Sequence, residues 1–436
     1  MISNRREFLK NTAVATAAVG VAPAILNACA SPADKVTVAL IGCRSMGWSN
    51  LQSILKLENV ECAVLCDVDA KVLEDKAAAL EKQTGTRPQT VGDFRRVLDN
   101  PDIDAVIIGT PDHWHAIIMM MALEAGKHVY VEKPMGHSIE ECNAMVAAQA
   151  KHPDLKVQVG MWQRSSKHWF EASEIVKSGE LGDVHLVKAW IYKGYDNPYP
   201  VREDTEAPDY VDYDMWLGPA PKRPFNPNRF HYNFRWWWDY AGGAMTDWGV
   251  HLLDFALHAM DADMPESITP GGGIFYHEKG AIETPDIQQA IYQYPKHVMI
   301  WESGLNPGIG PYQRGHGVAF IGQKGTLVLD RSGWQTLPDR NDTERKPFFE
   351  GKQQSNYGDG LDQHMENFVS CIRKGGQLNT PVEIGAKTAI VSEMGNISWR
   401  VGKRIHWNDS AKMFEEDMAN DLLKLNYSKD WQLPKV

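Results

Sequence analysis

KVTVALIGCRSMG, at residues 35–47, is the stretch that decides the fold class. Its first seven residues are mostly apolar and rich in β-branched side chains, which predicts a strand buried on both faces, as in a parallel sheet. A glycine-bounded turn follows, and then apolar residues at helical spacing, Leu51, Ile54 and Leu55. A strand, a glycine turn and a helix in this order indicate the first half of a βαβ unit.

The alternation of strands and helices continues to about residue 160. We expect further strands at 60–66, 105–109, 129–131 and 157–159, and helices at 70–83, 94–98, 115–125 and 139–150. Because parallel strands need helical crossovers, this alternation is typical of a doubly wound parallel sheet. Residues 35–158 are therefore predicted to form an N-terminal Rossmann domain.

The second half of the chain has a different pattern. Short strands are expected at 185–192, 290–294, 297–302, 318–321 and 326–329, and helices at 169–178, 248–260 and 362–374. Long loops rich in Pro, Gly and Asn join them, which favours a mostly antiparallel, open sheet. We predict an α/β protein with a C-terminal α+β domain at 159–400 and a polar, surface-wrapping extension at 401–436.

Composition limits the classes of partner. The 436-residue chain carries a net charge of −11, which disfavours nucleic acids and anionic membrane surfaces as partners. Its 15 tryptophans suit either a large core or the flat apolar faces of sugars.

The first 30 residues are predicted to be a twin-arginine signal peptide. NRREFLK at 4–10 is followed by an Ala-rich apolar run at 12–26, too short and too basic at its flank for a membrane span. Ala28-Cys29-Ala30 fits a cleavage site, whereas Leu26-Asn27-Ala28-Cys29 also resembles a lipobox. We expect a periplasmic protein that meets the membrane only through this signal or through a lipid on Cys29.

No metal site is expected. The cysteines after Cys29 are scattered through apolar segments and are predicted to be buried: Cys43, Cys62, Cys66, Cys142 and Cys371. Cys62 and Cys66 lack a second pair at zinc spacing. For residues 247–258, a metal held by Asp247, His251 and His258 is the weaker alternative.

A glycine turn and an acidic strand end suggest a dinucleotide site. Gly42 and Gly47 match the outer glycines of G-x-G-x-x-G, but Arg44 replaces the middle one, where the backbone normally approaches the pyrophosphate. Asp67 ends the second strand, where a carboxylate binds the ribose hydroxyls and repels a 2′-phosphate. The candidate contacts in this region are Gly42, Arg44, Met46, Gly47 and Asp67. A plain βαβ turn is the alternative.

Two further strand ends carry candidate cofactor contacts. In Thr110-Pro111-Asp112-His113-Trp114-His115, the residues Thr110, Pro111 and His115 either form a loop over a nicotinamide or simply begin a helix. The strand at 129–131 ends in Glu132-Lys133-Pro134, and a lysine delivered there is well placed to meet a ligand. The alternative is a lysine in a surface loop.

Residues 234–254 carry the acid/base candidates. Asp247 and His251 are four residues apart and Asp254 is three residues further, so on an α-helix all three share a face. A carboxylate beside an imidazole raises its basicity and suits a general base; the alternative is a capping aspartate with a core histidine. FRWWWDY at 234–240 is either a carbohydrate platform or part of the core. The candidate substrate contacts are Trp162, Arg164, Arg235, Trp237, Asp247 and His251.

In this order, the motifs resemble those of the Gfo/Idh/MocA oxidoreductase family, over nearly all of residues 35–400. The resemblance implies a bound NAD, less readily NADP, between a Rossmann domain and an open-sheet domain, and a homo-oligomer. It implies that Lys133, Asp247 and His251 are the catalytic group. Residues 214–221, DMWLGPAP, also resemble exported members of the family. Arg44 departs from the family pattern.

The resemblance implies hydride transfer from a hydroxyl of a sugar, glycoside or cyclitol. His251, tuned by Asp247, would take the hydroxyl proton while Lys133 holds the oxygen. Because free NAD should be scarce outside the cytoplasm, the cofactor would stay bound and be recycled. One alternative is an NAD-dependent glycoside hydrolase acting through a transient keto-sugar, like exported α-N-acetylgalactosaminidases of this family. The other is a cofactor-free surface sugar-binding protein.

Overall fold

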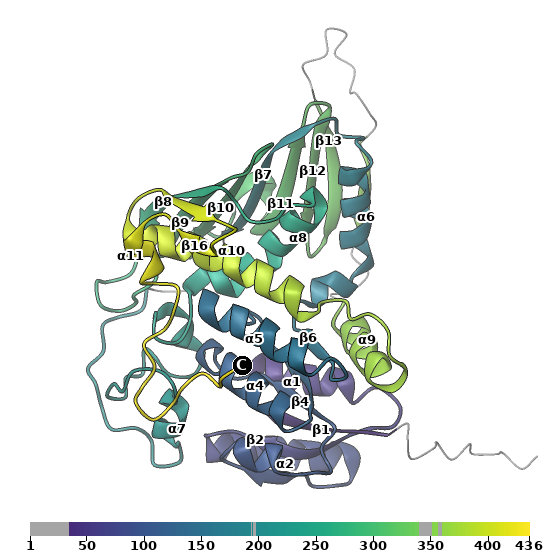
Figure 1. Ribbon diagram of the computed structural model, residues 1–436, viewed down its shortest axis with the longest axis vertical. Helices are drawn as coiled ribbons and strands as arrows, with labels where there is room; N and C mark the ends of the chain where they lie inside the picture. Colours follow the sequence, from purple (N-terminus) through teal and green to yellow (C-terminus); the bar gives the residue numbers. More distant parts are fainter. Residues whose placement is uncertain (1–34, 193, 195–197, 340–350, 356–359) are drawn as a thin grey trace, which may run out of the picture.

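The computed structural model describes residues 35–192, 194, 198–339, 351–355 and 360–436. The predicted signal peptide at 1–30, including Cys29, lies outside the described residues. The chain folds around two sheets, one above the other in Figure 1.

The first sheet is parallel throughout and confirms the predicted Rossmann architecture. Its order is β3-β2-β1-β4-β5-β6. Its strands are β1 (Val36–Ile41), β2 (Val60–Cys66), β3 (Gln89–Val91), β4 (Ala105–Ile108), β5 (His128–Val131) and β6 (Val157–Val159). The strand order reverses between β1 and β4, and ligands of doubly wound sheets bind beyond the carboxyl ends at such a point.

Helices cover this sheet, and one of them comes from late in the chain. The local helices are α1 (Ser45–Ile54), α2 (Ala70–Thr84), α3 (Arg95–Leu98), α4 (His115–Glu124) and α5 (Ile139–Lys151). Helix α9 (Leu361–Lys374) packs on α1, where Ser53 Oγ donates to Asp362 Oδ1 at 2.6 Å. The face of the Rossmann sheet is therefore completed by a segment that follows the second sheet.

The second sheet is mostly antiparallel, as predicted. Its order is β14-β13-β12-β11-β7-β10-β9-β8-β15-β16, and β7 and β10 are parallel neighbours. Its strands are β7 (Val184–Tyr192), β8 (Ser267–Gly273), β9 (Ile287–Gln293), β10 (Val298–Gly304), β11 (His316–Gly322), β12 (Gly325–Asp330), β13 (Gly333–Pro338), β14 (Gln353–Ser355), β15 (Ile405–Asn408) and β16 (Met413–Phe414).

Helices α6 (Lys167–Lys177), α8 (Val250–Met260) and α10 (Val382–Val401) pack against the second sheet (Figure 1). The shorter elements are α7 (Tyr213–Leu217), α11 (Asp417–Asn420), the 3-10 turns η2 (Asp112–Trp114), η3 (Trp162–Ser165), η4 (His231–Trp236) and η6 (Pro311–Gln313), and the π-helical turn η5 (Met245–Gly249).

Sequence pattern did not predict α10, which lies between α5 and the second sheet. Most of its side chains are buried, polar Thr388, Ser392 and Asn396 among them. A helix buried on several sides has no apolar stripe, which is the feature that periodicity detects.

The end of the chain returns to the first domain. Strand β15 pairs with β8, and the last residues then run to α4, where the C-terminus lies (Figure 1). There the ring of Trp431 packs edge-on against Trp114, with 4.7 Å between ring centroids. The C-terminal extension therefore joins the two domains as well as covering surface.

None of the helices in the described part of the chain combines the length and apolar character needed to cross a bilayer.

Candidate active site

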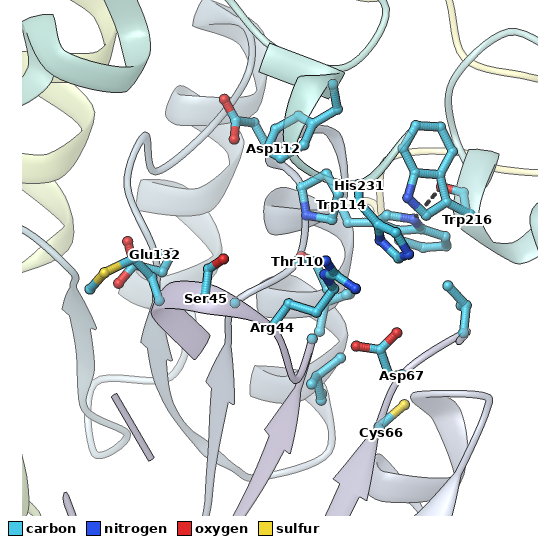
Figure 2. A pocket seen from close by; sticks show the side chains of 18 of the residues that line it. Arg44, Ser45, Cys66, Asp67, Thr110, Asp112, Trp114, Glu132, Trp216 and His231 are labelled. Atoms are coloured by element: carbon cyan, nitrogen blue, oxygen red, sulfur yellow. Dashed lines mark hydrogen bonds between the residues drawn. The ribbon is translucent and has the colours of Figure 1, made fainter. Parts of the chain in front are cut away.

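A cavity opens beyond the carboxyl ends of β1, β2, β4 and β5, at the point where the strand order reverses (Figure 2). The second domain closes it from the other side. The Rossmann side contributes Gly42, Arg44, Met46, Asp67, Phe94, Thr110, Pro111, Asp112, Trp114, Glu132 and Lys133, and the second domain contributes Met215, Trp216, His231, Tyr232, Phe234, Arg235 and Asp247. One cavity thus joins most of the predicted cofactor contacts to part of the predicted catalytic group.

Three glycines bring three backbone segments together at the floor of this cavity. Gly42 has a φ of +89°, which favours glycine. A Cβ atom on Gly47 would lie 2.1 Å from the carbonyl oxygen of Gly42, and one on Gly109 would lie 2.6 Å from the Cα of Gly47. The turn after β1, the first turn of α1 and the end of β4 therefore pack backbone to backbone. Amides at the N-terminus of α1 are left near the cavity, where a pyrophosphate would fit.

Arg44 occupies the middle fingerprint position without strain. Its φ of −96° and ψ of 166° are extended values that any side chain adopts. The side chain is exposed and lies at the cavity wall above Asp67 (Figure 2). The departure from the glycine fingerprint is therefore sterically permitted, and it adds a cation to the wall of the site.

Asp67 is held rigidly at the end of β2. Its Oδ2 accepts a hydrogen bond from the Cys43 amide at 2.8 Å, and its Oδ1 accepts one from the Asp69 amide at 3.0 Å. Burial raises the pKa of the Asp67 carboxyl, and these two hydrogen bonds oppose the rise. An acceptor fixed in this way suits ribose hydroxyls.

His115 does not line the cavity. Its ring is buried between the carbonyl oxygens of Pro134, at 2.7 Å, and Thr110, at 3.0 Å. Burial lowers the pKa of His115 to about 4, so the ring is neutral at pH 7. The predicted cofactor contact thus packs between the β4 and β5 strand ends and donates to one of these two carbonyls, beside the cis peptide bond Lys133–Pro134.

Glu132 forms the base of the lysine loop. Its Oε1 accepts from Asn50 Nδ2 at 2.8 Å, and its Oε2 accepts from the Lys133 amide at 3.2 Å. A Cβ atom on Gly160 would lie 2.7 Å from the Glu132 carboxylate. Burial raises the pKa of Glu132. These contacts fix the backbone that carries Lys133.

Lys133, Asp247 and Arg235 form the charged centre of the site. Lys133 Nζ donates to Asp247 Oδ1 and to the Asp247 backbone oxygen, both at 2.7 Å, and Arg235 Nε donates to the same Oδ1 at 3.2 Å. Burial raises the pKa of Asp247, but the charges and hydrogen bonds of Lys133 and Arg235 outweigh it and hold this pKa well below its ordinary value. Asp247 is therefore ionised, and its contacts fix the position of the Lys133 ammonium group.

The predicted pairing of Asp247 with His251 is not observed, and this corrects the expectation of a shared α-helical face. Asp247 belongs to the π-helical turn η5, in which residues four apart no longer stack as they do on an α-helix. His251 Nδ1 has no hydrogen-bond partner among the described residues, and its ring lies 5.7 Å from that of Trp162. Burial, followed by the charges of Lys133 and Arg331, holds the pKa of His251 well below its usual value.

The remaining predicted substrate contacts lie away from this cavity. Arg164 makes a buried, bidentate ion pair with Asp254, with N–O distances of 2.8 to 3.0 Å, so Asp254 faces Arg164 rather than His251. Trp237 is buried in the core and donates its Nε1 hydrogen to the carbonyl of Asn228 at 2.9 Å. The aromatic run at 234–240 therefore serves the core at this position.

Sequence reasoning missed Asp112 as a site residue. It follows Thr110-Pro111, lines the cavity and is buried (Figure 2). Burial raises its pKa to about 7, against the lowering effects of Lys133 and Arg235. A carboxyl group three residues past the predicted strand end at Gly109 was the available signal. His231, Tyr232, Met215 and Trp216 were also missed as cavity residues, because only the tertiary fold brings their loop there.

The raised pKa of Asp112 makes stability depend on pH. Between about pH 4 and pH 7 the folded chain binds a proton that the unfolded chain has released, so this group lowers the free energy of unfolding as pH rises. We expect the free energy of unfolding of Asp112→Asn, measured relative to the wild type, to rise by about a few kcal/mol from pH 5 to pH 8. Denaturant titrations at both pH values would measure it, and a constant difference would contradict the expectation.

Among the described residues, no group of three or more His, Cys, Asp or Glu side chains is arranged to hold a metal ion. Cys43, Cys66, Cys142 and Cys371 are buried and Cys62 is half-buried, all as free thiols.

The fold and this cavity define a dinucleotide-binding oxidoreductase. Residues 36–161 match the family model described as an oxidoreductase family with an NAD-binding Rossmann fold, and residues 175–271 match the model of its C-terminal alpha/beta domain. The chain therefore belongs to the Gfo/Idh/MocA family of oxidoreductases, and its first domain is an NAD-binding domain.

Relatives agree with this assignment. Oxidoreductase YrbE of Bacillus subtilis, described as uncharacterized, is 25% identical over 285 residues, covering 61% of this chain and 71% of that protein. A glycosyl hydrolase family 109 protein of Shewanella baltica is 36% identical over 161 residues. That match covers 32% of this chain and spans only 35% of the relative.

Solved structures share the fold. The aldose-aldose oxidoreductase of Caulobacter crescentus, complexed with glycerol, has a TM-score of 0.64 and 20% identity, covering 85% of this chain and 99% of that one. Levoglucosan dehydrogenase, complexed with NADH and levoglucosan, has a TM-score of 0.64 and 18% identity, covering 85% and 99%.

Proposed function

We propose that this protein oxidises a hydroxyl of a sugar, glycoside or cyclitol by hydride transfer to NAD. The observation that carries the proposal is the Lys133 ammonium group, held by Asp247 in the same cavity as Asp67. Because β2 and β5 are separated by β1 and β4, the two ends of this cavity are far enough apart for the two ends of a dinucleotide. The two sugar-related structural neighbours support a carbohydrate substrate.

Lys133, His251 and Asp247 have separate roles in this reaction. When bound, the nicotinamide ring supplies the hydride acceptor. Lys133 donates a hydrogen bond to the substrate oxygen and stabilises its developing negative charge. His251, neutral at pH 7, accepts the hydroxyl proton as the carbinol C–H electrons leave and the C=O bond forms. Asp247 orients Lys133 rather than His251 in this scheme, because its carboxylate faces the ammonium group.

Asp67 favours NAD over NADP. A half-buried carboxylate at the end of β2 accepts hydrogen bonds from ribose hydroxyls and repels a 2′-phosphate. Arg44 at the same wall would contact the pyrophosphate or the ribose edge, and a cation there weakens but does not remove this discrimination.

We also propose that the protein works in the periplasm as an exported homo-oligomer, with or without a lipid on Cys29, and keeps its cofactor through successive turnovers. The twin-arginine motif at 4–10 supports export of the folded, loaded chain. Return of the hydride to a second sugar would close the redox cycle.

Glycoside cleavage through a transient keto-sugar is the second candidate. It is favoured by one observation, the 36% identity to the family 109 glycosyl hydrolase over 161 residues. In this reaction the hydride returns to the same sugar after the aglycone leaves, so no net NADH accumulates.

The test is a cofactor and product assay on purified full-length protein. We expect NAD to be released on denaturation, and absorbance at 340 nm to rise when the correct sugar is added to the native protein. Aglycone release without net NADH would instead support glycoside cleavage. Protein that neither contains nor binds NAD, yet binds sugars, would overturn the proposal in favour of a sugar-binding protein.

A further inference from the structure

A segment of the second domain covers the dinucleotide cavity where β2 ends. Two backbone hydrogen bonds join it to the residues after Asp67: the Ala70 amide donates to the Tyr210 carbonyl, and the Asp212 amide donates to the Val68 carbonyl, both at 2.9 Å. The segment continues through α7 to Arg235, and Met215, Trp216, His231, Tyr232, Phe234 and Arg235 line the cavity. We call residues 210–235 the roof.

The roof is also fixed above the β4 strand end. Trp114 Nε1 donates to the carbonyl of Trp216 at 3.2 Å, and a Cβ atom on Gly218 would lie 2.0 Å from the Trp114 ring. From outside, Ser428 Oγ in the C-terminal extension donates to the Gly218 carbonyl at 2.9 Å. These contacts leave the middle of the roof little freedom to lift.

Two side-chain contacts hold the roof over the adenosine end: Lys71 Nζ lies 3.6 Å from the centre of the Tyr210 ring, and His231 faces Asp69. His231 Nε2 lies 2.9 Å from Oδ2 of buried Asp69, whose Oδ1 caps α2 by accepting from the Lys71 and Val72 amides. His231 adopts a φ of +49°, a conformation that the surrounding contacts must hold. In Figure 2 its ring lies above Arg44 and Asp67. We call Asp69 and His231 the latch.

We propose that the roof and its latch retain the dinucleotide, so that NAD leaves only when the His231–Asp69 contact opens. The inference rests on the proposed NAD-dependent function and adds a structural reason for a cofactor that stays bound. A cofactor lying between Asp67 and Lys133 passes beneath cavity residues from Trp216 to Arg235, so its ends cannot separate from the Rossmann domain while the roof is down.

Asp69 can be changed without altering the cavity lining, whereas His231 itself lines the cavity. His231→Asn keeps a residue that tolerates positive φ, but its shorter side chain cannot reach Asp69. Asp69→Ser keeps an oxygen that caps α2 and removes the carboxylate that faces His231. Lys222→Ala is the matched control, because Lys222 lies on the roof, is exposed, and pairs with the exposed Asp214 and Asp430.

The experiment measures exchange of bound NAD for isotope-labelled NAD in purified holoenzyme. We expect slow exchange in the wild type and in Lys222→Ala, and about tenfold or more faster exchange in both latch variants. Activity of Asp69→Ser should fall on gel filtration and return with added NAD, with kcat close to the wild-type value.

Two results would overturn the inference while leaving the function intact: free exchange of NAD in the wild type, or latch variants that exchange at the wild-type rate. A wild-type protein that binds no NAD at any concentration would instead overturn the proposed function, and the retention role with it.

Discussion

Lys133→Met is expected to lower kcat by about three orders of magnitude, with little change in NAD content. The substitution keeps the side chain as far as Cε but removes the ammonium group that stabilises charge on the substrate oxygen, and losses of one such donor cost about 10² to 10³ in rate. Asp247 also loses its closest partner, the Lys133 ammonium at 2.7 Å. Single-turnover formation of NADH from bound NAD would measure the step directly.

The loss of that ion pair must be separated from the loss of catalysis. Lys133→Arg keeps a positive charge beside Asp247, so it should preserve thermal stability but misplace the donor. Lys412→Met is the surface control, since the exposed Lys412 pairs with the exposed Asp409. A Lys133→Met enzyme that is folded, loaded with NAD and turns over within about threefold of the wild type would contradict the assigned role.

Gly47→Ala is expected to abolish detectable NAD binding and to destabilise the first domain. The new Cβ would lie 2.1 Å from the carbonyl oxygen of Gly42, a backbone atom that no side-chain rotation can move. Relief requires α1 to shift away from β1, which spoils the floor under the pyrophosphate and costs about 1–3 kcal/mol or more. Binding can be followed by tryptophan fluorescence and unfolding by denaturant titration.

Gly308→Ala is the matched control for this substitution, because among the described residues no heavy atom beyond its chain neighbours lies within 4 Å of the Cβ it would add. It should leave NAD affinity and the unfolding midpoint unchanged. Equal NAD affinity in Gly47→Ala and Gly308→Ala would show that the glycine floor is not required for the cofactor.

The Rossmann half was predictable because its signals are local. Strand β1, the glycine turn and Asp67 follow one another within 33 residues, and each was identified from short runs and turn chemistry. The strand that ends at Val131 and the lysine after it were identified in the same way. Burial on both faces gives parallel strands a continuous apolar pattern that is easily recognised.

The site itself was predictable only in part. Lys133 and Asp247 are 114 residues apart, so hydrophobic periodicity cannot reveal their contact. The order of the motifs identified both residues as candidates but did not predict that they pair. The roof residues Trp216 and His231 lie in loops whose position depends on backbone pairing with Val68 and Ala70. Helix α10 escaped prediction because it is buried on several sides.

The π-helical turn at Met245–Gly249 fixes the number of residues that must separate Asp247 from α8. A π turn accommodates one residue more than an α turn, so removal of one residue there would restore a regular α-helix into α8. Everything before the deletion would then rotate by about 100° relative to α8, the angle that separates neighbouring residues on a helix. Asp247 would swing away from Lys133 while His251 kept its place. The extra residue therefore changes the angular offset between two neighbouring helical turns, so that Asp247 and His251 face different partners.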